Sequence, residues 1–539
     1  MWFLILLIVS YLLLSVSLYF LFPKAGEEGW KGLVPGLNFV VWCRLIGRKG
    51  WHAAWLLFPL VNIFIYAGLA IDMVRSFRKY DFWHSVVAVL FAPFFFFYLA
   101  FSKDEQYDGP TLEKEQEYKA QVAEAAAAAN QSRKLQKLQA NNPYRKSATR
   151  EWAEAIIFAV FAAAFIRMFL IEAYVIPTPS MEGSLLVGDF LFVSKAHYGI
   201  RTPETVLMVP LLHNRIPILN TESYLKEPSL PYYRLPALES IDRNDPVVFN
   251  FPEGDSVYVF PDRTWSIYDY RRGAVPPEEA RQIKAGTKKL ITRPMDKKDH
   301  YIKRCVGISG DSLQVIDRQV YINGQPAKNP KYLQFMYIVT FPAGAINTSK
   351  FSEWGISKGD MIAQLGNLSY VIILSDEQKA KVESLDPNIE VTPVDMRQLD
   401  GNSGKFFPHD TEHFPGWTAD NYGPVYIPKK GATVKISPEN LALYRRVIEV
   451  YEGNQVAVRD GKIFINGQET DAYTFRMNYY WMMGDNRHNS EDSRVWGFVP
   501  EDHVVGKPVI IWFSTSKEGN NIFSRINFKR IFKPVGNLE

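Results

Sequence analysis

The chain has 539 residues, enough for a sizeable core and more than one domain. Its net charge of +4 is small and evenly mixed, which argues against a nucleic-acid-binding protein. Only two cysteines occur, Cys43 among N-terminal apolar segments and Cys305 far along the chain, so we expect no disulfide. No His/Cys cluster has metal-ligand spacing, and we therefore expect neither a metal nor another cofactor.

Four apolar stretches predict an α-helical membrane region of about four spans. A bilayer core requires roughly 18–20 apolar residues in one helix, and each stretch approaches or exceeds that length. The first lacks a basic start and a small-residue cleavage motif, so we interpret it as a retained anchor. The stretches are 1–22, 53–74, 83–101 and 156–176.

Basic residues in the flanks predict the orientation of these spans. The loop 23–52 and the residues before the fourth span are basic, which suits the cytoplasm, and everything from Tyr174 onward is then expected outside. The loop 72–81 is basic too, yet four clean spans would place it outside; a re-entrant early segment would remove this conflict. The basic residues before the fourth span are Arg133, Lys134, Lys137, Arg145, Lys146 and Arg150.

The pattern of the rest predicts a linker followed by a mainly β domain. Residues 102–150 are charged and alanine-rich, typical of a solvated cytoplasmic helix or linker. From about residue 174, short runs of Val, Ile, Tyr and Phe alternate with turn-formers, which indicates β-strands on the outer membrane surface. RDGK at 459–462 is a hairpin signal. VYINGQ (320–325) and IFINGQ (463–468) predict two similar hairpins, and 376–386 is the best helix candidate.

The stretch PTPSMEG places Ser180 directly after the fourth apolar run. The prolines could simply stop a helix at the membrane edge. Alternatively, Ser180 is a nucleophile, which requires an adjacent base. The nine histidines lie in no recognisable catalytic setting, and only His300 and His488 are near other candidate residues. A neutral lysine in apolar surroundings is the other choice of base.

Two later segments could supply such a base and its support. In HYIKRCVGISGD (300–311), strand alternation puts Lys303 and Arg304 on opposite faces, so one of them should point inward. From this segment alone, two surface charges on an edge strand would be the better interpretation, because lysines are rarely buried. The polar loop GDNRHNSEDSRVWGFVP (484–500) is flanked by apolar runs and could orient a base through hydrogen bonds.

Together these segments resemble the bacterial type I signal peptidases, membrane-bound Ser/Lys proteases that remove signal peptides from exported proteins. The matching motifs occur in the order of the family, after a transmembrane stretch. They are IPTPSMEGSLLVGDFLFVSK (176–195), RNDPVVFNFP (243–252), YIKRCVGISGD (301–311) and GDNRHNSEDSRVWGFVP (484–500).

The resemblance implies roles for individual residues. Ser180 matches the nucleophile, Lys303 the general base, and Thr178 a hydroxyl that completes the oxyanion hole with the Ser180 N–H. Met181 is expected beside the pocket for a small substrate residue, and Ser490 is expected to position the lysine amine. The remaining matches are Asp492 and Arg494 as an ion pair behind the site, and Gly484, Asp485 and Asn486 as the residues that shape the turn.

The sequence departs from the family pattern in four respects. Threonine replaces the more usual serine at 178, and His488 stands where an aspartate is common. Three additional spans precede the usual anchor, either as extra anchoring or as a regulatory or export-machinery contact. A long insertion at 325–455 separates the lysine and GDNR motifs and could face the membrane or guide substrate.

The resemblance also implies a fold class and a location. We expect a mainly β extracytoplasmic catalytic domain at the outer face of the bacterial cytoplasmic membrane. Its partners would be signal-peptide-bearing preproteins, membrane phospholipid and the protein-export machinery, with no nucleic acid. The expected division is a membrane region (1–101), a linker (102–150), an anchor (151–176), a catalytic domain (177–324 and 456–530) and the insertion (325–455).

Two other classes of function were weighed. A membrane-anchored binding or assembly protein would have the same composition and no catalytic pair. A Ser/Lys self-cleaving repressor would share the broad fold class, but no DNA-binding helix-turn-helix or basic surface is apparent, and four spans argue against it.

Overall fold

A computed structural model describes residues 2–58, 61–127, 132–145, 148–216, 219, 221–342, 349–400, 404–516 and 523–538. Lys146 and residues 59–60 of the second predicted span lie outside this part. The chain forms two compact units, the first from residues 1–166 and 205–229 and the second from 167–204 and 230–539.

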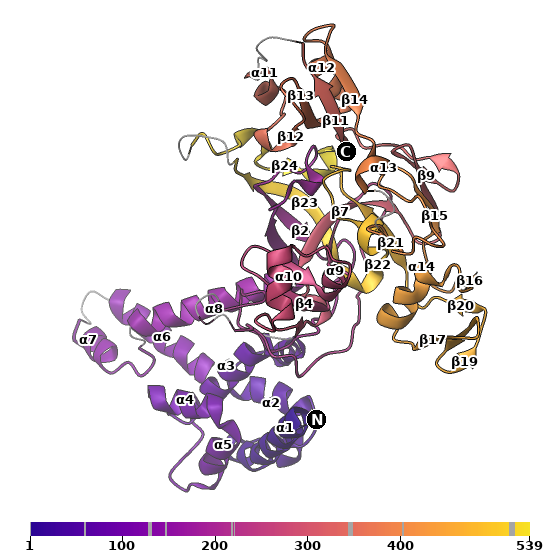
Figure 1. The fold of residues 1–539 in the computed structure, drawn as a ribbon. Helices are drawn as coiled ribbons and strands as arrows, with labels where there is room; N and C mark the ends of the chain where they lie inside the picture. The colour runs from indigo at the N-terminus through magenta and orange to yellow at the C-terminus, as the bar shows by residue number, and fades with distance from the viewer. Residues whose placement is uncertain are drawn as a thin grey trace. The chain divides into compact units, whose positions relative to one another are not determined.

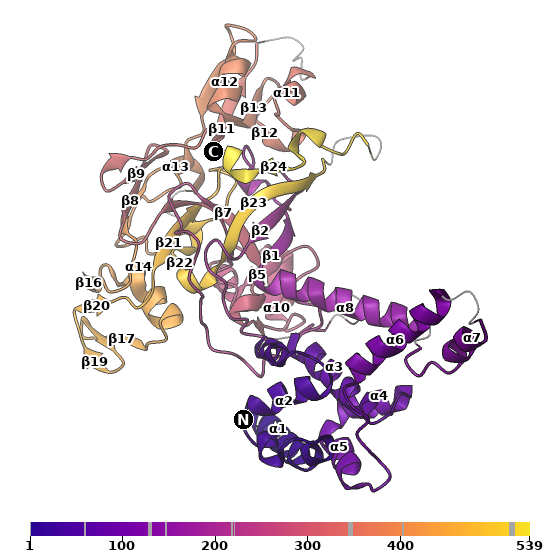
Figure 2. The same cartoon turned by 180° about the vertical axis from the view of Figure 1, so that it is seen from behind.

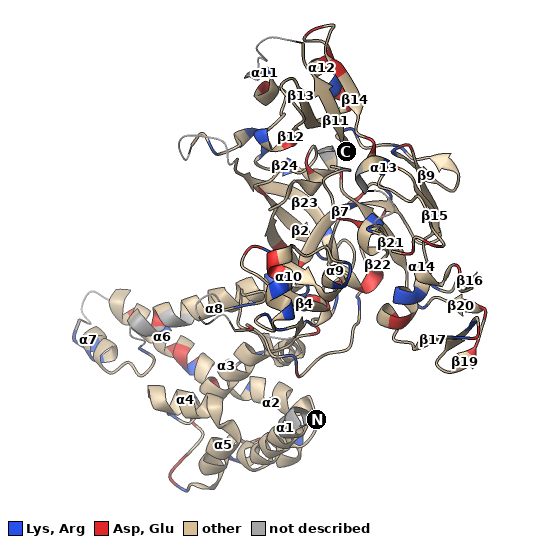
Figure 3. Ribbon diagram, in the orientation of Figure 1, with Lys and Arg blue, Asp and Glu red and all other residues tan. Residues whose placement is uncertain are grey.

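The first unit is helical (Figure 1). Figure 3 shows α1, α4 and α5 almost without charged residues, whereas α6 carries both signs. The helices are α1 Trp2–Leu21, α2 Leu37–Leu45, α3 Val61–Arg75, α4 Phe82–Leu90, α5 Ala92–Phe101, α6 Thr111–Ala127, α7 Ser132–Ala140 and α8 Ala148–Phe169, with 3₁₀ turns at Phe22–Ala25, Gly29–Gly32 and Gly50–Leu57.

The prediction of four separate spanning helices is not met by the described residues. One segment, Ile8–Ala25, is long and apolar enough to cross a membrane. The helices α4 and α5 reach that length only together, and they are bent by 114° at Phe91, where Pro93 in the first turn of α5 has no N–H to continue the helix. The second predicted span is divided into a 3₁₀ turn and α3.

The prediction of a fourth span over 156–176 is also wrong, at its C-terminal end. The helix α8 stops at Phe169, and Ile171–Val175 forms strand β1, which pairs with β2 Asp189–Ser194. Lys195 explains this end, because its Nζ donates to the carbonyl oxygens of Arg167 at 2.8 Å and Met168 at 3.2 Å. A cation that satisfies the last carbonyls is a favourable helix cap.

Polar contacts in the first unit join loops that are far apart in the sequence. Lys24 Nζ donates to the Leu99 carbonyl oxygen at 2.7 Å, which ties the end of α1 to the end of α5. Arg48 and Asp72 form an ion pair at 2.9 Å that joins the loop after α2 to the end of α3. Further ion pairs between distant parts of this unit are Arg78–Asp108 at 2.5 Å and Lys79–Glu105 at 2.6 Å.

The second unit is mostly β-structure, as predicted, and is organised around an eight-stranded antiparallel sheet. Its order is β1-β2-β23-β3-β7-β21-β22, with β24 against β23, so β1 lies at one edge. The long β23 and its neighbour β2 are seen best from behind (Figure 2). The remaining bounds are β3 Pro246–Asn250, β7 His300–Gly307, β21 Tyr479–Met483, β22 Val499–Pro500, β23 Val504–Ser514 and β24 Lys533–Pro534.

The described residues also form five smaller sheets. The insertion contributes the sheet β12-β13-β11-β14, and the sheet β10-β9-β8-β15 joins it to the rest. The strands are β4 Ser256–Val259, β5 Thr264–Ser266, β6 Ile291–Thr292, β8 Ser312–Ile316, β9 Gln319–Ile322, β10 Gln325–Pro326, β11 Gln334–Thr340, β12 Met361–Gln364, β13 Ser369–Ser375, β14 Glu390–Pro393, β15 Tyr422–Tyr426, β16 Thr433–Lys435, β17 Val456–Arg459, β18 Lys462–Ile465, β19 Gln468–Glu469 and β20 Ala472–Thr474. The helices are α9 Ile267–Arg271, α10 Pro277–Lys284, α11 Ser349–Glu353, α12 Asp376–Glu383, α13 Met396–Asp400, α14 Leu441–Arg446 and α15 Ser493–Trp496, followed by a π-turn at Val447–Tyr451 after α14.

The predicted hairpins are confirmed. RDGK joins β17 to β18, and the two NG turns join β9 to β10 and β18 to β19. Asn323 and Gly324 have φ of 52° and 78°, and Asn466 and Gly467 have φ of 52° and 84°. Positive φ at both central residues defines the tight turn that Asn-Gly favours.

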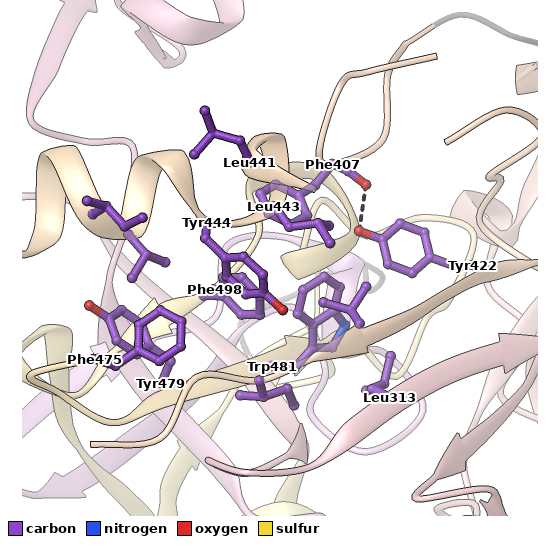
Figure 4. Packing of buried hydrophobic residues seen from close by; sticks show 14 of the residues in the cluster. Leu313, Phe407, Tyr422, Leu441, Leu443, Tyr444, Phe475, Tyr479, Trp481 and Phe498 are labelled. Carbon is purple, nitrogen blue, oxygen red and sulfur yellow. Dashed lines mark hydrogen bonds between the residues drawn. The ribbon is translucent and has the colours of Figure 1, made fainter. Parts of the chain in front are cut away.

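The largest core cluster of the second unit lies between β21 and α14 (Figure 4). Trp481 is fully buried and its ring centroid lies 5.5 Å from that of Phe498. Tyr422 on β15 donates its hydroxyl proton to the Phe407 carbonyl oxygen at 2.6 Å, which joins two parts of the insertion within this core (Figure 4).

Tyr422→Phe removes a buried hydrogen bond and little else, so we expect it to lower the free energy of unfolding by about 1–3 kcal/mol. The measurement is chemical unfolding of the detergent-solubilised protein followed by tryptophan fluorescence. Tyr233→Phe is the control, since that side chain is 61% exposed. Equal stability of the two variants would contradict the prediction.

Candidate active site

Ser180 lies in a short helical turn, Pro179–Met181, immediately beyond strand β1. Pro179 is the first residue of this turn, a position that suits a fixed φ and a missing N–H. Asn486 holds the turn from the other side, since its N–H donates to the Ser180 carbonyl oxygen at 3.2 Å and its amide to that of Pro179 at 3.3 Å. Pro179 and Asn486 thus orient the serine.

Lys303 reaches Ser180 from β7. Its Nζ donates to Ser180 Oγ at 2.8 Å and to the Ile302 carbonyl oxygen at 3.0 Å. The two side chains are 5% and 8% exposed. Burial lowers the pKa of Lys303 to about 8, against the opposing field of nearby carboxylates. With this pKa about a tenth of the amine is neutral at pH 7 and able to accept a proton, far more than for a lysine with the ordinary pKa.

The sequence leads us to expect only one inward side chain from Lys303 and Arg304, but the structure buries both. Arg304 is 2% exposed on the face of β7 opposite Lys303. It forms a two-pronged ion pair with Asp485, with Nε–Oδ1 at 2.8 Å and Nη2–Oδ2 at 2.7 Å. Ser184 donates to the same carboxylate at 2.5 Å. Sequence analysis missed Arg304 and Ser184 as site residues, although the alternation of the strand pointed to Arg304.

Gly484 and Asp492 pack the polar loop against the serine. A Cβ at position 484 would collide with the Ser180 carbonyl oxygen and with Ser490 Oγ. The Gly484 N–H donates to Asp492 Oδ2 at 3.1 Å, and Asp492 is paired with Arg494 at 2.8 Å. Gly484, Asp492 and Arg494 are all buried. The resemblance places the Asp492–Arg494 pair behind the site.

Ser490 lies in this loop but is not bonded to the amine. Its hydroxyl donates to the Glu491 carbonyl oxygen at 3.5 Å and also interacts with the Asp492 carboxylate. It lines the same cavity as Lys303. Its expected role in positioning the amine stays a prediction.

Ser180 and Lys303 face a cavity of about 550 Å³. Thr178 is exposed at its rim, while Met181 is 1% exposed and packs against Ile176 and Leu191. Tyr174, Val248 and Ile302 make the same wall apolar. Four further lining residues come from the insertion and were not predicted: Met396, Lys405, Phe406 and Ala419.

The two candidate histidines, His488 and His300, make contacts with residues other than Ser180. His488 accepts the Met336 N–H on Nδ1 at 3.1 Å, so its proton is on Nε2, which lies 2.7 Å from Asp420 Oδ1. The histidine therefore joins the polar loop to the insertion. His300 packs edge-to-face on Tyr174, with ring centroids 4.9 Å apart. The hydrogen bond to Ser180 Oγ in the described part of the chain comes from Lys303.

Asp485→Asn should lower the free energy of unfolding by about 3–5 kcal/mol, because it leaves the Arg304 guanidinium buried without its counter-charge. Chemical unfolding of the detergent-solubilised protein measures this change. The matched control is Glu469→Gln, which breaks an exposed pair with Lys462 at 2.8 Å and should cost less than about 1 kcal/mol. A similar loss in both variants would contradict the prediction.

Comparisons with known proteins agree with this geometry. A family profile described as signal peptidase, peptidase S26, matches residues 149–338 and 473–513. The unmatched stretch between them holds most of the insertion. A second profile, of a family of unknown function, matches residues 30–110 of the helical unit.

Curated relatives cover most of the chain and of their own length. A signal peptidase I of Helicobacter pylori (strain J99) is 24% identical over 72% of this chain and 92% of the relative. Those of Haemophilus influenzae and Buchnera aphidicola (subsp. Schizaphis graminum) are 25% and 26% identical, over 70% of this chain and 74% and 78% of the relative. With the S26 match around the serine and lysine, these relatives show that the chain is similar to the type I signal peptidases over most of its length.

Proposed function

We propose that this protein removes signal peptides from exported preproteins, with Ser180 as nucleophile and neutral Lys303 as general base. The observation that supports this most strongly is the buried 2.8 Å contact between Lys303 Nζ and Ser180 Oγ. A purely structural lysine would gain nothing from being held against a serine away from water, because burial opposes its charge. A binding protein would not require this contact.

The reaction follows the Ser/Lys variant of nucleophilic catalysis. Lys303 Nζ takes the Ser180 proton as Oγ attacks the scissile carbonyl carbon. The oxyanion is stabilised by the Ser180 N–H and the Thr178 hydroxyl, of which the first lies at the start of a helical turn and needs no intrahelical acceptor. Lys303 then gives the proton to the leaving amine, and water hydrolyses the acyl-enzyme with the same amine as base.

Substrate selection is proposed to begin at the wall that contains Met181. This wall is closely packed and apolar, with Ile176 3% and Leu191 0% exposed, so it suits a small side chain before the scissile bond. Phospholipid is a proposed partner because signal peptides lie in the bilayer with their cleavage sites at its outer face. Contact with the export machinery is proposed for the additional helices.

The polar contacts of the helical unit favour a topology with two crossings. Arg48–Asp72 joins both ends of the segment that holds α3, and Lys24–Leu99 joins the end of α1 to the end of α5. Charged groups that meet in this way share one side of a membrane. In this proposal α1 crosses inward and α3 to α5 form re-entrant segments. The outward crossing is made by α8, whose apolar part, Ala155–Phe169, is shorter than that of α1. All the basic loops are then cytoplasmic, and the catalytic unit is outside.

The dyad predicts a rise of activity with pH. The unprotonated amine is the active form, so kcat/KM for a synthetic preprotein should rise about tenfold per pH unit below about 8 and level off above it. Cleavage by the detergent-purified protein is compared with that by Ser180→Ala and Lys303→Met, each of which should abolish it. Activity in Lys303→Met would show that another residue is the base. If the wild type cleaved nothing, the hypothesis of a binding protein would be favoured.

The topology predicts that both early loops are cytoplasmic. Single cysteines replace Glu28, Asp81 and Lys119, whose side chains are 65%, 83% and 71% exposed, with Lys462→Cys as the outside control. A membrane-impermeant thiol reagent added to intact spheroplasts should label only position 462, and permeabilisation should expose the other three. Labelling of position 81 in intact spheroplasts would contradict this two-crossing topology.

A further inference from the structure

The catalytic cavity has a second wall, made by the insertion, that the proposed reaction does not use. Met396, Phe406 and Ala419 lie on it. Met396 and Ala419 form a small buried cluster with Val394, and Phe406 packs against that cluster while remaining half-buried. Phe406 is therefore the part of this apolar wall that a ligand can reach.

This wall is built rigidly into the site. The Phe407 N–H donates to the Arg494 carbonyl oxygen at 2.8 Å, and Arg494 Nη1 donates to the Ala419 carbonyl oxygen at 3.2 Å. The same guanidinium is paired with Asp492 at 2.8 Å. The residue that holds the Asp492 carboxylate therefore also holds two points of the insertion wall.

Two further contacts fix the position of the wall. The Phe407 ring is buried in the core, with its centroid 5.5 Å from that of Phe498 (Figure 4). His488 reaches Asp420, the residue after Ala419, at 2.7 Å. A binding surface held from both ends in this way loses little entropy when it binds a ligand.

The two walls lie at different parts of a chain that passes Ser180. The wall with Met181 is assigned to the small residue before the scissile bond, an assignment that rests on the proposed function. A substrate chain that reaches Ser180 along this wall must leave past the loop 487–495 and the insertion, since these complete the lining of the cavity. The insertion wall then meets the residues that follow the cut.

We propose that the insertion provides a subsite for an apolar side chain among the first three residues after the scissile bond, with Phe406 as its main contact. The subsite binds part of the mature protein rather than the signal peptide. Burial of such a side chain against an aromatic ring stabilises the bound chain in proportion to the apolar area removed from water.

The test is a series of synthetic preprotein peptides with one signal region and either Leu or Gly at the first, second or third position after the cut. The wild-type protein should prefer Leu at one of these positions by on the order of tenfold in kcat/KM. Phe406→Ala should reduce that Leu/Gly ratio toward one. Phe406→Leu, a milder change to the packing, should keep a preference for Leu with a Leu/Gly ratio between those of the wild type and Phe406→Ala.

The control is Ile362→Ala on β12, an insertion residue that is 44% exposed and does not line the cavity. It should leave the Leu/Gly ratio of the wild type unchanged. No preference in the wild type, or an unchanged ratio in both Phe406 variants, would overturn the subsite. If the wild type cleaved none of the peptides, the proposed function itself would fail, a result distinct from cleavage without preference.

Discussion

The structure is organised around one buried amine, that of Lys303, whose pKa is lowered beside a hydroxyl. Lys303 lies near three acidic residues, Asp485, Glu491 and Asp492, whose fields favour its protonated form. Each acid has an arginine of its own: Arg304 for Asp485, Arg263 for Glu491 and Arg494 for Asp492. The ion pairs of the described residues do not include Lys303. The arginines therefore offset the negative field while the acids keep their structural bonds.

This arrangement explains why the polar loop after β21 is so densely bonded. Asp492 accepts the Gly484 N–H and so holds the backbone of the loop, whereas Asp485 accepts from the side chains of Arg304 and Ser184. The close approach of Gly484 to the Ser180 carbonyl oxygen leaves no room for a Cβ. Electrostatics and packing are thus provided by the same few residues.

Much of the second unit was predictable because its signals are local. The NG and DG turns require positive φ, and alternation along β7 separates Lys303 from Arg304, so hairpins and strand followed from short motifs. The resemblance also predicted Ser180 and Lys303, whose side chains the structure brings into contact. The Arg304–Asp485 pair was missed because its partners are far apart in the sequence, and burial of two adjacent cations is visible only once both faces of the strand are covered. The insertion wall was missed for the same reason, since Phe406 reaches the cavity through tertiary contacts alone.

The membrane region was predicted less well, because apolar length does not distinguish a straight helix from a bent one. Pro93 breaks one predicted span, and Lys195 ends another by capping α8 at Phe169. That last feature has a geometric consequence. Ser180 follows Phe169 by eleven residues. An extended chain of that length reaches at most about 40 Å, and part of it is fixed in β1. In the proposed reaction, this covalent link therefore limits how far from the end of α8 the scissile peptide bond can lie.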